Sequence, residues 1–206
     1  MALIYVASSN PGKLADFATA AREHGIDVRA LPAMDGIVPP EETGKTFEEN
    51  AVLKAEYYSR YAQREILIAD DSGLTVDALH GEPGVRSARY AEDAGISRTD
   101  ADAANNELLL KRAEGIPEAQ RQCAFVCSIA AAREGRALKT FTADARGVLL
   151  HAPRGTGGFG YDPLFYFPEL NKSFAELSRE EKLRVSHRGK SFRLFLEWID
   201  NTARNG

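Results

Sequence analysis

The sequence predicts an α/β fold with a mixed β-sheet, and two observations support this class. Over the first part of the chain, apolar segments of strand length alternate with amphipathic helical segments. Further on, two long segments rich in β-branched and aromatic residues, 120–133 and 137–149, flank the tight turn Glu134-Gly135-Arg136. Alternating strands and helices give parallel pairs, whereas a tight turn joins antiparallel strands, so together they predict one mixed sheet flanked by helices.

The opening of the chain predicts a β-α-β unit. Residues 2–7 are an apolar run typical of a strand, and the residues after it favour the start of a helix. Asn10 is a good N-cap, and Pro11 suits the first helical position. Gly25 is expected to end this helix, and residues 26–31 alternate like a second strand.

Two capping boxes predict later helix starts. Thr46 and Glu49 have the spacing in which a hydroxyl and a carboxylate satisfy the free backbone N–H groups of a helix. We expect this helix to run to about Gln63. Ser178 and Glu181 show the same pattern ahead of the terminal helical segment, which carries an apolar face.

The remaining segments are assigned from their composition. Residues 66–69 predict a short apolar strand that ends at Asp70, whereas residues 78–98 look irregular. A helix is expected over residues 100–113. Residues 155–160 form a glycine-rich loop after the predicted hairpin.

Composition limits the class of protein. The chain has 206 residues, of which 44% are apolar and 27% charged, as is ordinary for one globular domain spanning residues 1–206. The formal net charge of −4 argues against broad nucleic-acid binding. No apolar run reaches the roughly 20 residues of a membrane helix, and the first residues do not resemble a signal peptide. We therefore expect a cytoplasmic protein without membrane partners.

The two cysteines predict buried thiols rather than a disulfide. Cys123 and Cys127 are four residues apart in an expected strand, so their side chains point to one side at a separation of about 13 Å. No Cys/His group has the spacing of a zinc site. Any metal should therefore be a hard cation held by oxygen ligands.

The turn after the first strand is a candidate triphosphate cradle. It comprises Ser8, Ser9, Asn10, Pro11, Gly12 and Lys13. A strand-to-helix turn collects free backbone N–H groups and the positive end of the helix dipole at one place. The spacing is not that of a Walker loop, and an ordinary capped turn is an equally good interpretation of these residues alone.

Carboxylates in two segments are candidate ligands of Mg²⁺. Asp70 and Asp71 follow the predicted strand at 66–69, and Glu41-Glu42 lies in the preceding loop. Mg²⁺ typically takes one or two protein carboxylates together with substrate phosphates. Adjacent strand residues point in opposite directions, so only one aspartate is expected to reach the site. A simple turn remains an alternative for the aspartate pair. Lys54, about eight residues into the helix predicted after Thr46, is by default a solvated surface lysine.

The glycine-rich loop predicts a platform for a nucleotide base. Within it, Phe159, Gly160, Tyr161 and Asp162 combine two aromatic side chains, expected to be exposed, with a carboxylate that could contact a base edge. A flexible hairpin loop is the alternative interpretation. Ser186-His187-Arg188, at the start of the terminal helix, offers hydrogen-bond donors, with a solvated surface pair as its alternative.

Six motifs, taken together and in order, resemble those of one known family. They are SSNPGK, EETGKTFEENAVLKA, ADDSGL, PGVRSARY, GTGGFGYDPLF and EEKLRVSHRGK. The set resembles the Ham1/RdgB family of pyrophosphatases for non-standard purine nucleoside triphosphates, also called inosine triphosphatases. The resemblance extends from Ser8 to Lys190.

This resemblance implies a role for each matching residue. It assigns triphosphate binding to Ser8, Asn10 and Lys13, with Lys54 approaching the phosphates. It makes Glu42 a metal ligand, with Glu41 beside it as the alternative, and Asp71 both a metal ligand and the catalytic residue. Further substrate contacts are implied for Ser72, Phe159, Gly160, Tyr161, Asp162, Lys182, His187 and Arg188.

The resemblance also implies a fold, a reaction and partners. It implies a long mixed sheet with two lobes and a central cleft, a homodimer, and Mg²⁺-dependent hydrolysis of ITP, dITP and XTP to a monophosphate and pyrophosphate. Two alternatives remain, the first still an enzyme and the second from a different class of function. One is a Maf-like pyrophosphatase for other modified nucleotides, and the other is a non-catalytic nucleotide-binding protein. An RNA-binding module is the weakest candidate, given the acidic balance.

Overall fold

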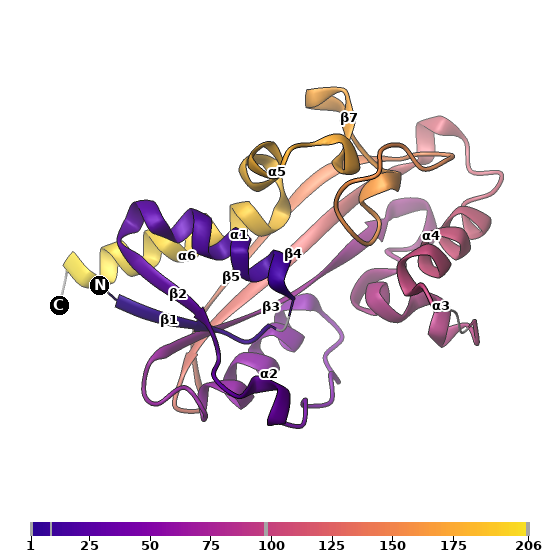
Figure 1. The fold of residues 1–206 in the computed structure, drawn as a ribbon. Coiled ribbons are helices and arrows are strands. Elements are labelled where there is room, and N and C mark those ends of the chain that lie inside the picture. Colours follow the sequence, from indigo (N-terminus) through magenta and orange to yellow (C-terminus); the bar gives the residue numbers. More distant parts are fainter. Residues whose placement is uncertain (1, 9, 97–98, 205–206) are drawn as a thin grey trace. The chain divides into compact units, whose positions relative to one another are not determined.

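The computed structural model describes residues 2–8, 10–96 and 99–204 and shows a mixed α/β fold (Figure 1). Seven strands are hydrogen-bonded in the order β2-β1-β3-β4-β5-β6-β7. The strands are β1 (Ala2–Val6), β2 (Ile26–Ala30), β3 (Ile66–Val76), β4 (Gln122–Arg133), β5 (Arg136–Leu149), β6 (Phe165–Phe167) and β7 (Lys172–Ser173). The helices are α1 (Pro11–Ala21), α2 (Phe47–Ser59), α3 (Tyr90–Asp93), α4 (Ala101–Arg112), α5 (Arg179–Val185) and α6 (His187–Arg204). The predicted fold class is confirmed.

The chain divides into two compact units. The first comprises Met1–Asp71, Cys127–Ala143 and His187–Gly206, and the second comprises Ser72–Val126 and Asp144–Ser186. The strands β3, β4 and β5 each contribute residues to both units. The division falls between Asp71 and Ser72, so two neighbouring candidate site residues belong to different units.

In the first unit, helices cover both faces of the strands. The strand β1 pairs in parallel with β2 and β3. The helices α1 and α6 lie on one face and α2 on the other (Figure 1). Along β3, Ile68 packs in the cluster with α1 and α6, whereas Leu67 and Ala69 pack in the cluster with α2. This period of two fixes the face that every later residue of β3 presents.

The predicted helix starts are confirmed. The Asn10 side chain accepts hydrogen bonds from the backbone N–H groups of Gly12 and Lys13 at the start of α1. Both halves of the capping box are present at Thr46 in α2 and at Ser178 in α5. Local hydrogen bonding between a side chain and nearby backbone therefore sets where these helices begin.

Two predicted ends are wrong. The strand β3 does not stop at Asp70 but runs from Ile66 to Val76, with both aspartates in its interior. Charged residues are tolerated there because cationic side chains from the helices neutralise them and because β4 continues to pair with the strand. The helix α2 ends at Ser59 rather than near Gln63, since Gln63 itself has a positive φ of 50° that no helix allows.

The segments predicted as irregular contain further structure. Residues 78–98 include a 3-10 helix from Gly84 to Arg89, followed directly by α3. Beyond the glycine-rich loop, the short strands β6 and β7 pair in antiparallel fashion. The sequence did not predict these two strands. Strands of two or three residues are too short to produce a recognisable alternation. The long β4–β5 hairpin is confirmed, with a two-residue turn at Glu134 and Gly135.

The core of the second unit contains a cluster of aromatic rings and one buried cation. Phe125, Phe165 and Phe174 contact one another with ring centroids 4.5 to 5.6 Å apart. Arg121 is only 2% exposed. Its guanidinium donates hydrogen bonds to four backbone carbonyls, those of Ala113, Ile116, Leu149 and Leu150. These bonds tie the end of α4 to the end of β5, from which the glycine-rich loop departs.

The two thiols are predicted to be unreactive in the folded protein. Cys123 and Cys127 are free and buried in β4, as the sequence predicts. Burial raises the pKa of each thiol to about 12, and the thiolate is the reactive species. Iodoacetamide at pH 8 should add no label to the native protein and two labels after unfolding, measured by intact mass. Rapid labelling of the native protein would contradict the buried positions.

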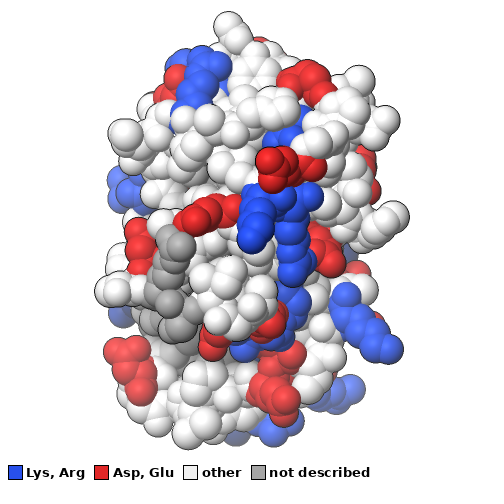
Figure 2. Space-filling model, turned by 90° about the vertical axis from the view of Figure 1, so that its right-hand side faces the viewer, with Lys and Arg blue, Asp and Glu red and all other residues white. Residues whose placement is uncertain are grey.

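The surface carries both signs of charge. On the face drawn in Figure 2, lysine and arginine side chains stand beside aspartate and glutamate side chains. That mixture agrees with the net charge of −4. Among the described residues, no helix combines the length and the apolar character needed to cross a bilayer.

Candidate functional site

The first cluster of candidate residues surrounds Asp70. Lys13 in α1 donates a hydrogen bond from Nζ to Asp70 Oδ2 over 2.8 Å. Arg188 in α6 places its Nε 3.5 Å from the same oxygen. The side chain of Asp70 is 2% exposed and that of Arg188 is 5% exposed. Asp70 shares the face of β3 with Ile68, the face covered by α1 and α6, so the strand alternation explains its partners.

The second cluster lies on the opposite face of β3, around Asp71. Lys54 in α2 donates from Nζ to Asp71 Oδ1 over 2.7 Å, and the same Nζ is 3.0 Å from Glu42 Oε1. One ammonium group is therefore held between two carboxylates. Lys54 is 16% exposed and Asp71 11% exposed by side chain, so this cluster is accessible from solvent but largely desolvated.

Asn50 belongs to the same cluster, although the sequence analysis did not single it out. Its Nδ2 lies 3.5 Å from Asp71 Oδ2, and its Oδ1 accepts a hydrogen bond from the backbone of Gly44 over 2.8 Å. Asn50 is 2% exposed and stands four residues before Lys54, on the same face of α2. The sequence offered one signal for Asn50, a polar side chain one helical turn before Lys54 and on the same face of the helix.

The cluster changes the acidity of both partners. Burial raises the pKa of the Asp71 carboxyl, and the charges of Glu42 and Asp70 act in the same direction against the opposing effect of Lys54. Burial lowers the pKa of the Lys54 ammonium, but the neighbouring carboxylates outweigh burial and raise that pKa overall. Asp71 is thereby a better proton acceptor than an ordinary aspartate, while Lys54 stays positively charged.

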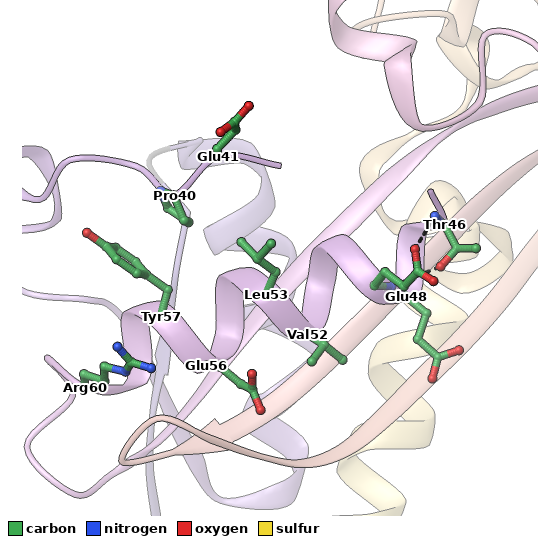
Figure 3. A pocket seen from close by; sticks show the side chains of 10 residues that line it. Pro40, Glu41, Thr46, Glu48, Val52, Leu53, Glu56, Tyr57 and Arg60 are labelled. Atoms are coloured by element: carbon green, nitrogen blue, oxygen red, sulfur yellow. Dashed lines mark hydrogen bonds between the residues drawn. The ribbon is translucent and has the colours of Figure 1, made fainter. Parts of the chain in front are cut away.

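The two neighbouring glutamates have different surroundings. Glu42 reaches Lys54 Nζ, whereas Glu41 lines a separate open groove along α2 with a volume of about 790 Å³ (Figure 3). Leu53 and Tyr57 give this groove an apolar side. The groove is lined by none of the residues in the Asp70 and Asp71 clusters, so it is distinct from the candidate site.

The second unit holds the residues predicted to bind a base. Asp162 is 2% exposed, and its Oδ2 accepts hydrogen bonds from the backbone N–H of Phe159, over 2.8 Å, and from Lys182 Nζ. Lys182 Nζ also lies 4.6 Å from the centroid of the Phe159 ring. Phe159 as a whole is 42% exposed. An exposed aromatic face with a cation beside it can stack on a flat heterocycle and donate a hydrogen bond to its edge.

The prediction that both aromatic side chains of this loop are exposed is wrong for Tyr161. Tyr161 is 4% exposed, and its hydroxyl donates to the Ser87 carbonyl over 2.8 Å. The backbone explains the difference between the two rings. Gly158 has a φ of +73°, and a side chain there would place its Cβ 2.1 Å from Asp162 Oδ2. This turn directs Phe159 outward and sends Tyr161 into the core.

Four further predicted residues are placed as follows. Ser8 lies at the α1 turn, where its Oγ accepts a hydrogen bond from the Asn10 backbone. His187 is 4% exposed, at the start of α6 beside Arg188, and Ser72 is half-buried in β3 next to Asp71. Ser9 lies outside the described residues. The free N–H groups expected at the α1 turn are partly used, because Asn10 itself accepts from Gly12 and Lys13.

The Asp71 cluster fits a hard divalent cation. Its donors are two carboxylates, Glu42 and Asp71, which already hold one positive charge between them in the form of Lys54. Among the described residues, no group of three or more His, Cys, Asp or Glu side chains could complete a metal site alone. Mg²⁺ suits such a set, because it uses few protein carboxylates and takes its other ligands from water and phosphates.

Two aspartates on successive residues of β3, each paired with cationic side chains from the flanking helices, define a class, the α/β proteins that bind a polyanion together with a hard cation. Within that class the family can be stated. The chain belongs to the Ham1 family, whose model matches residues 4–198.

Individual relatives agree with this assignment. A dITP/XTP pyrophosphatase from Acidobacterium capsulatum is 51% identical over 196 residues, which cover 94% of this chain and 96% of the relative. A dITP/XTP pyrophosphatase from Geobacillus kaustophilus is 48% identical over 189 residues, covering 91% and 89% respectively. The solved Ham1 protein of Staphylococcus aureus superposes with a TM-score of 0.83 at 38% identity, covering 97% of this chain and 99% of that one. A Ham1 protein from Coxiella burnetii gives 0.85 at 34% identity, covering 98% and 100%.

Proposed function

We propose that this chain is a hydrolase that converts dITP, ITP and XTP to the nucleoside monophosphate and pyrophosphate. The observation that carries the proposal is the Asp71 cluster, in which two carboxylates and a lysine ammonium stand together in a chain of the Ham1 family. Relatives that share about half of its residues over nearly its whole length are dITP/XTP pyrophosphatases. The reaction removes deaminated purine nucleotides from the cytoplasmic pool.

In this proposal the residues around Asp70 and Asp71 bind the triphosphate. Glu42 and Asp71 would hold Mg²⁺, which would supply neutralisation of phosphate charge and a lowered pKa for a bound water. Lys13 and Lys54 are paired with carboxylates in the structure. When a triphosphate enters, these ammonium groups can turn to its oxygens, and they position the chain of phosphates for attack.

Asp71 is the proposed catalytic residue. Its carboxylate accepts a proton from the attacking water, whose oxygen forms a bond to the α-phosphorus. The bond from the α-phosphorus to the oxygen that bridges to the β-phosphorus breaks, and pyrophosphate leaves with that oxygen. The raised pKa of Asp71 favours this proton transfer. Lys54 offsets negative charge as it develops on the leaving oxygens.

The loop that carries Phe159 is proposed to bind the base. Phe159 stacks on the purine, and the polarity of the hydrogen bonds at the edge of the base determines which purine is accepted. Hypoxanthine and xanthine have an acceptor at position 6, where adenine has a donor, so a donor in the site pairs with the first two and repels the third. The sequence predicts His187 and Arg188 as this donor. In the structure Lys182, whose ammonium lies over the Phe159 ring, is a further candidate donor.

A substrate panel tests the proposal. Pyrophosphate release should be measured from dITP, ITP, XTP, ATP and GTP, each with and without Mg²⁺. We expect kcat/KM for the first three to exceed that for ATP by roughly 10²-fold or more, since a mismatched buried donor and acceptor discriminate strongly, and we expect release to require the cation. Equal turnover of ATP would overturn the proposed selectivity, and binding without turnover would support the non-catalytic alternative.

Isotope incorporation tests the point of attack. In water enriched in ¹⁸O, attack at the α-phosphorus places the label in the monophosphate. Label in the pyrophosphate would instead show attack at the β-phosphorus and contradict the proposed role of Asp71. A Maf-like enzyme would be recognised by its substrates, because it would prefer pyrimidine or other modified nucleotides to dITP, ITP and XTP.

We also propose a homodimer, which sedimentation at equilibrium would test.

A further inference from the structure

The glycine that follows Phe159 is held by two side chains of α4. Asp102 Oδ2 accepts a hydrogen bond from the Gly160 backbone N–H over 2.7 Å. Asn106 Nδ2 donates to the Gly160 carbonyl over 2.9 Å. Asp102 and Asn106 are one helical turn apart, so they stand on the same face of α4 and grip one residue at its two polar groups.

These contacts fix the backbone on both sides of the exposed ring. Before the ring, the Phe159 N–H donates to the buried Asp162. After it, the next two peptide groups are held by Asp102 and Asn106. Three successive peptide groups are thus bonded to side chains, which restricts both backbone torsions of Phe159 while the residue stays 42% exposed.

Asn106 carries a polar atom that stability alone does not explain. Its Nδ2 must face Gly160, because a carbonyl can only accept, and its Oδ1 therefore points away. Among the described residues, no hydrogen-bond donor reaches this oxygen, which is buried. A buried acceptor without a partner is unfavourable, so a leucine at this position would avoid the cost that the asparagine bears.

We propose that Asp102 and Asn106 are positioning residues for substrate, which act through Gly160 to hold the Phe159 ring ready for a purine base. This inference rests on the proposed function for the identity of the ligand. A ring that is already ordered loses less freedom when the base stacks on it, so the nucleotide binds more tightly. The α4 contacts therefore set affinity for the nucleotide and leave the chemical step alone.

Asn106→Leu is the central variant. It removes the bond to Gly160 and also the unpartnered oxygen. We expect KM for dITP to rise about five- to tenfold, as for the loss of one ordering hydrogen bond, with kcat unchanged. We expect the melting temperature to stay the same or rise. Weaker dIMP binding by calorimetry should match the change in KM without depending on turnover.

Asn105→Ala is the matched control from the neighbouring position. Asn105 is buried, accepts from the Ala91 N–H over 2.8 Å and donates to the Ala88 carbonyl, so it ties α4 to the segment before it rather than to the base-binding loop. Its loss should lower the melting temperature and leave KM unchanged. The two adjacent asparagines are thus expected to show opposite patterns.

Asp102 and Phe159 complete the test. Asp102→Asn keeps an oxygen that can accept from Gly160 and should retain most of the affinity, whereas Asp102→Ala should raise KM as Asn106→Leu does. In a Phe159→Ala background, Asn106→Leu should add no further change, because the ring through which it acts is gone.

An unchanged KM in Asn106→Leu would overturn the inference, as would an equal increase in KM with and without Phe159. If the unmodified protein did not hydrolyse dITP, the proposed function would fail instead. The dIMP calorimetry would then decide the positioning role separately.

Discussion

Asp71→Asn is expected to reduce kcat for dITP by about 10³-fold or more while the fold remains intact. The amide has the shape of the carboxylate but can neither accept the proton of the attacking water nor contribute charge to a cation site, and removal of a positioned base alone costs about 10²- to 10⁴-fold. Pyrophosphate release, measured with thermal unfolding, checks both parts of this expectation. The melting temperature should not fall, because the change also removes a charge whose burial is unfavourable.

The adjacent glutamates provide a matched pair of controls for this prediction. Glu42→Gln should lower activity, because Glu42 shares the Lys54 ammonium with Asp71. Glu41→Gln should leave activity near that of the unmodified protein, because Glu41 lines the groove along α2. Retention of more than a tenth of the activity by Asp71→Asn would contradict the catalytic role. Equal losses in the two glutamate variants would contradict the choice of Glu42.

Local rules in the sequence predicted the elements of the fold that depend on local interactions. Caps at Asn10, Thr46 and Ser178 fixed three helix starts correctly, because each cap is satisfied by backbone within three residues. The end of β3 could not be predicted in this way. Asp70 and Asp71 read as a turn, since the lysines that neutralise them lie far away in sequence, at positions 57 and 17 residues earlier.

The candidate site shows the same limit. The resemblance to the family motifs identified Lys54, Glu42 and Asp71 as candidate site residues. Their spacing in the sequence alone did not show that these side chains contact one another. Asn50 was missed because its one signal, a position one helical turn before Lys54, does not by itself show that the side chain reaches Asp71. Tyr161 was expected to be exposed because composition alone does not separate it from Phe159, and its hydrogen bond to the distant Ser87 carbonyl appears only in the structure. Strand alternation in the structure then explains why the two neighbouring aspartates have different partners.

That difference between neighbours leads to the second large effect, in Asp70→Asn. We expect a loss of about 3–5 kcal/mol in the free energy of unfolding, the usual consequence of removing one member of a buried ion pair. Asp70 is 2% exposed by side chain and faces the cations Lys13 and Arg188. The amide leaves those two cations without the charge that balances them. Urea unfolding at neutral pH measures the loss, and Asp71→Asn, one residue away, serves as the control that should show little of it.

The dependence of this loss on pH follows from the acidity of Asp70. Burial opposes ionisation, but the charges of Lys13 and Arg188 outweigh burial and hold the pKa of Asp70 well below its ordinary value. Because the pKa of Asp70 is lower in the folded than in the unfolded protein, its ionisation stabilises the fold at pH values above the unfolded pKa of about 3.9. This stabilisation is lost as the pH falls below that value. The difference between the unmodified protein and Asp70→Asn should therefore be full at pH 6 to 8 and narrow below about pH 4. A difference that stayed constant down to pH 3 would show that packing, and not the charge of Asp70, holds α1 and α6 at this strand.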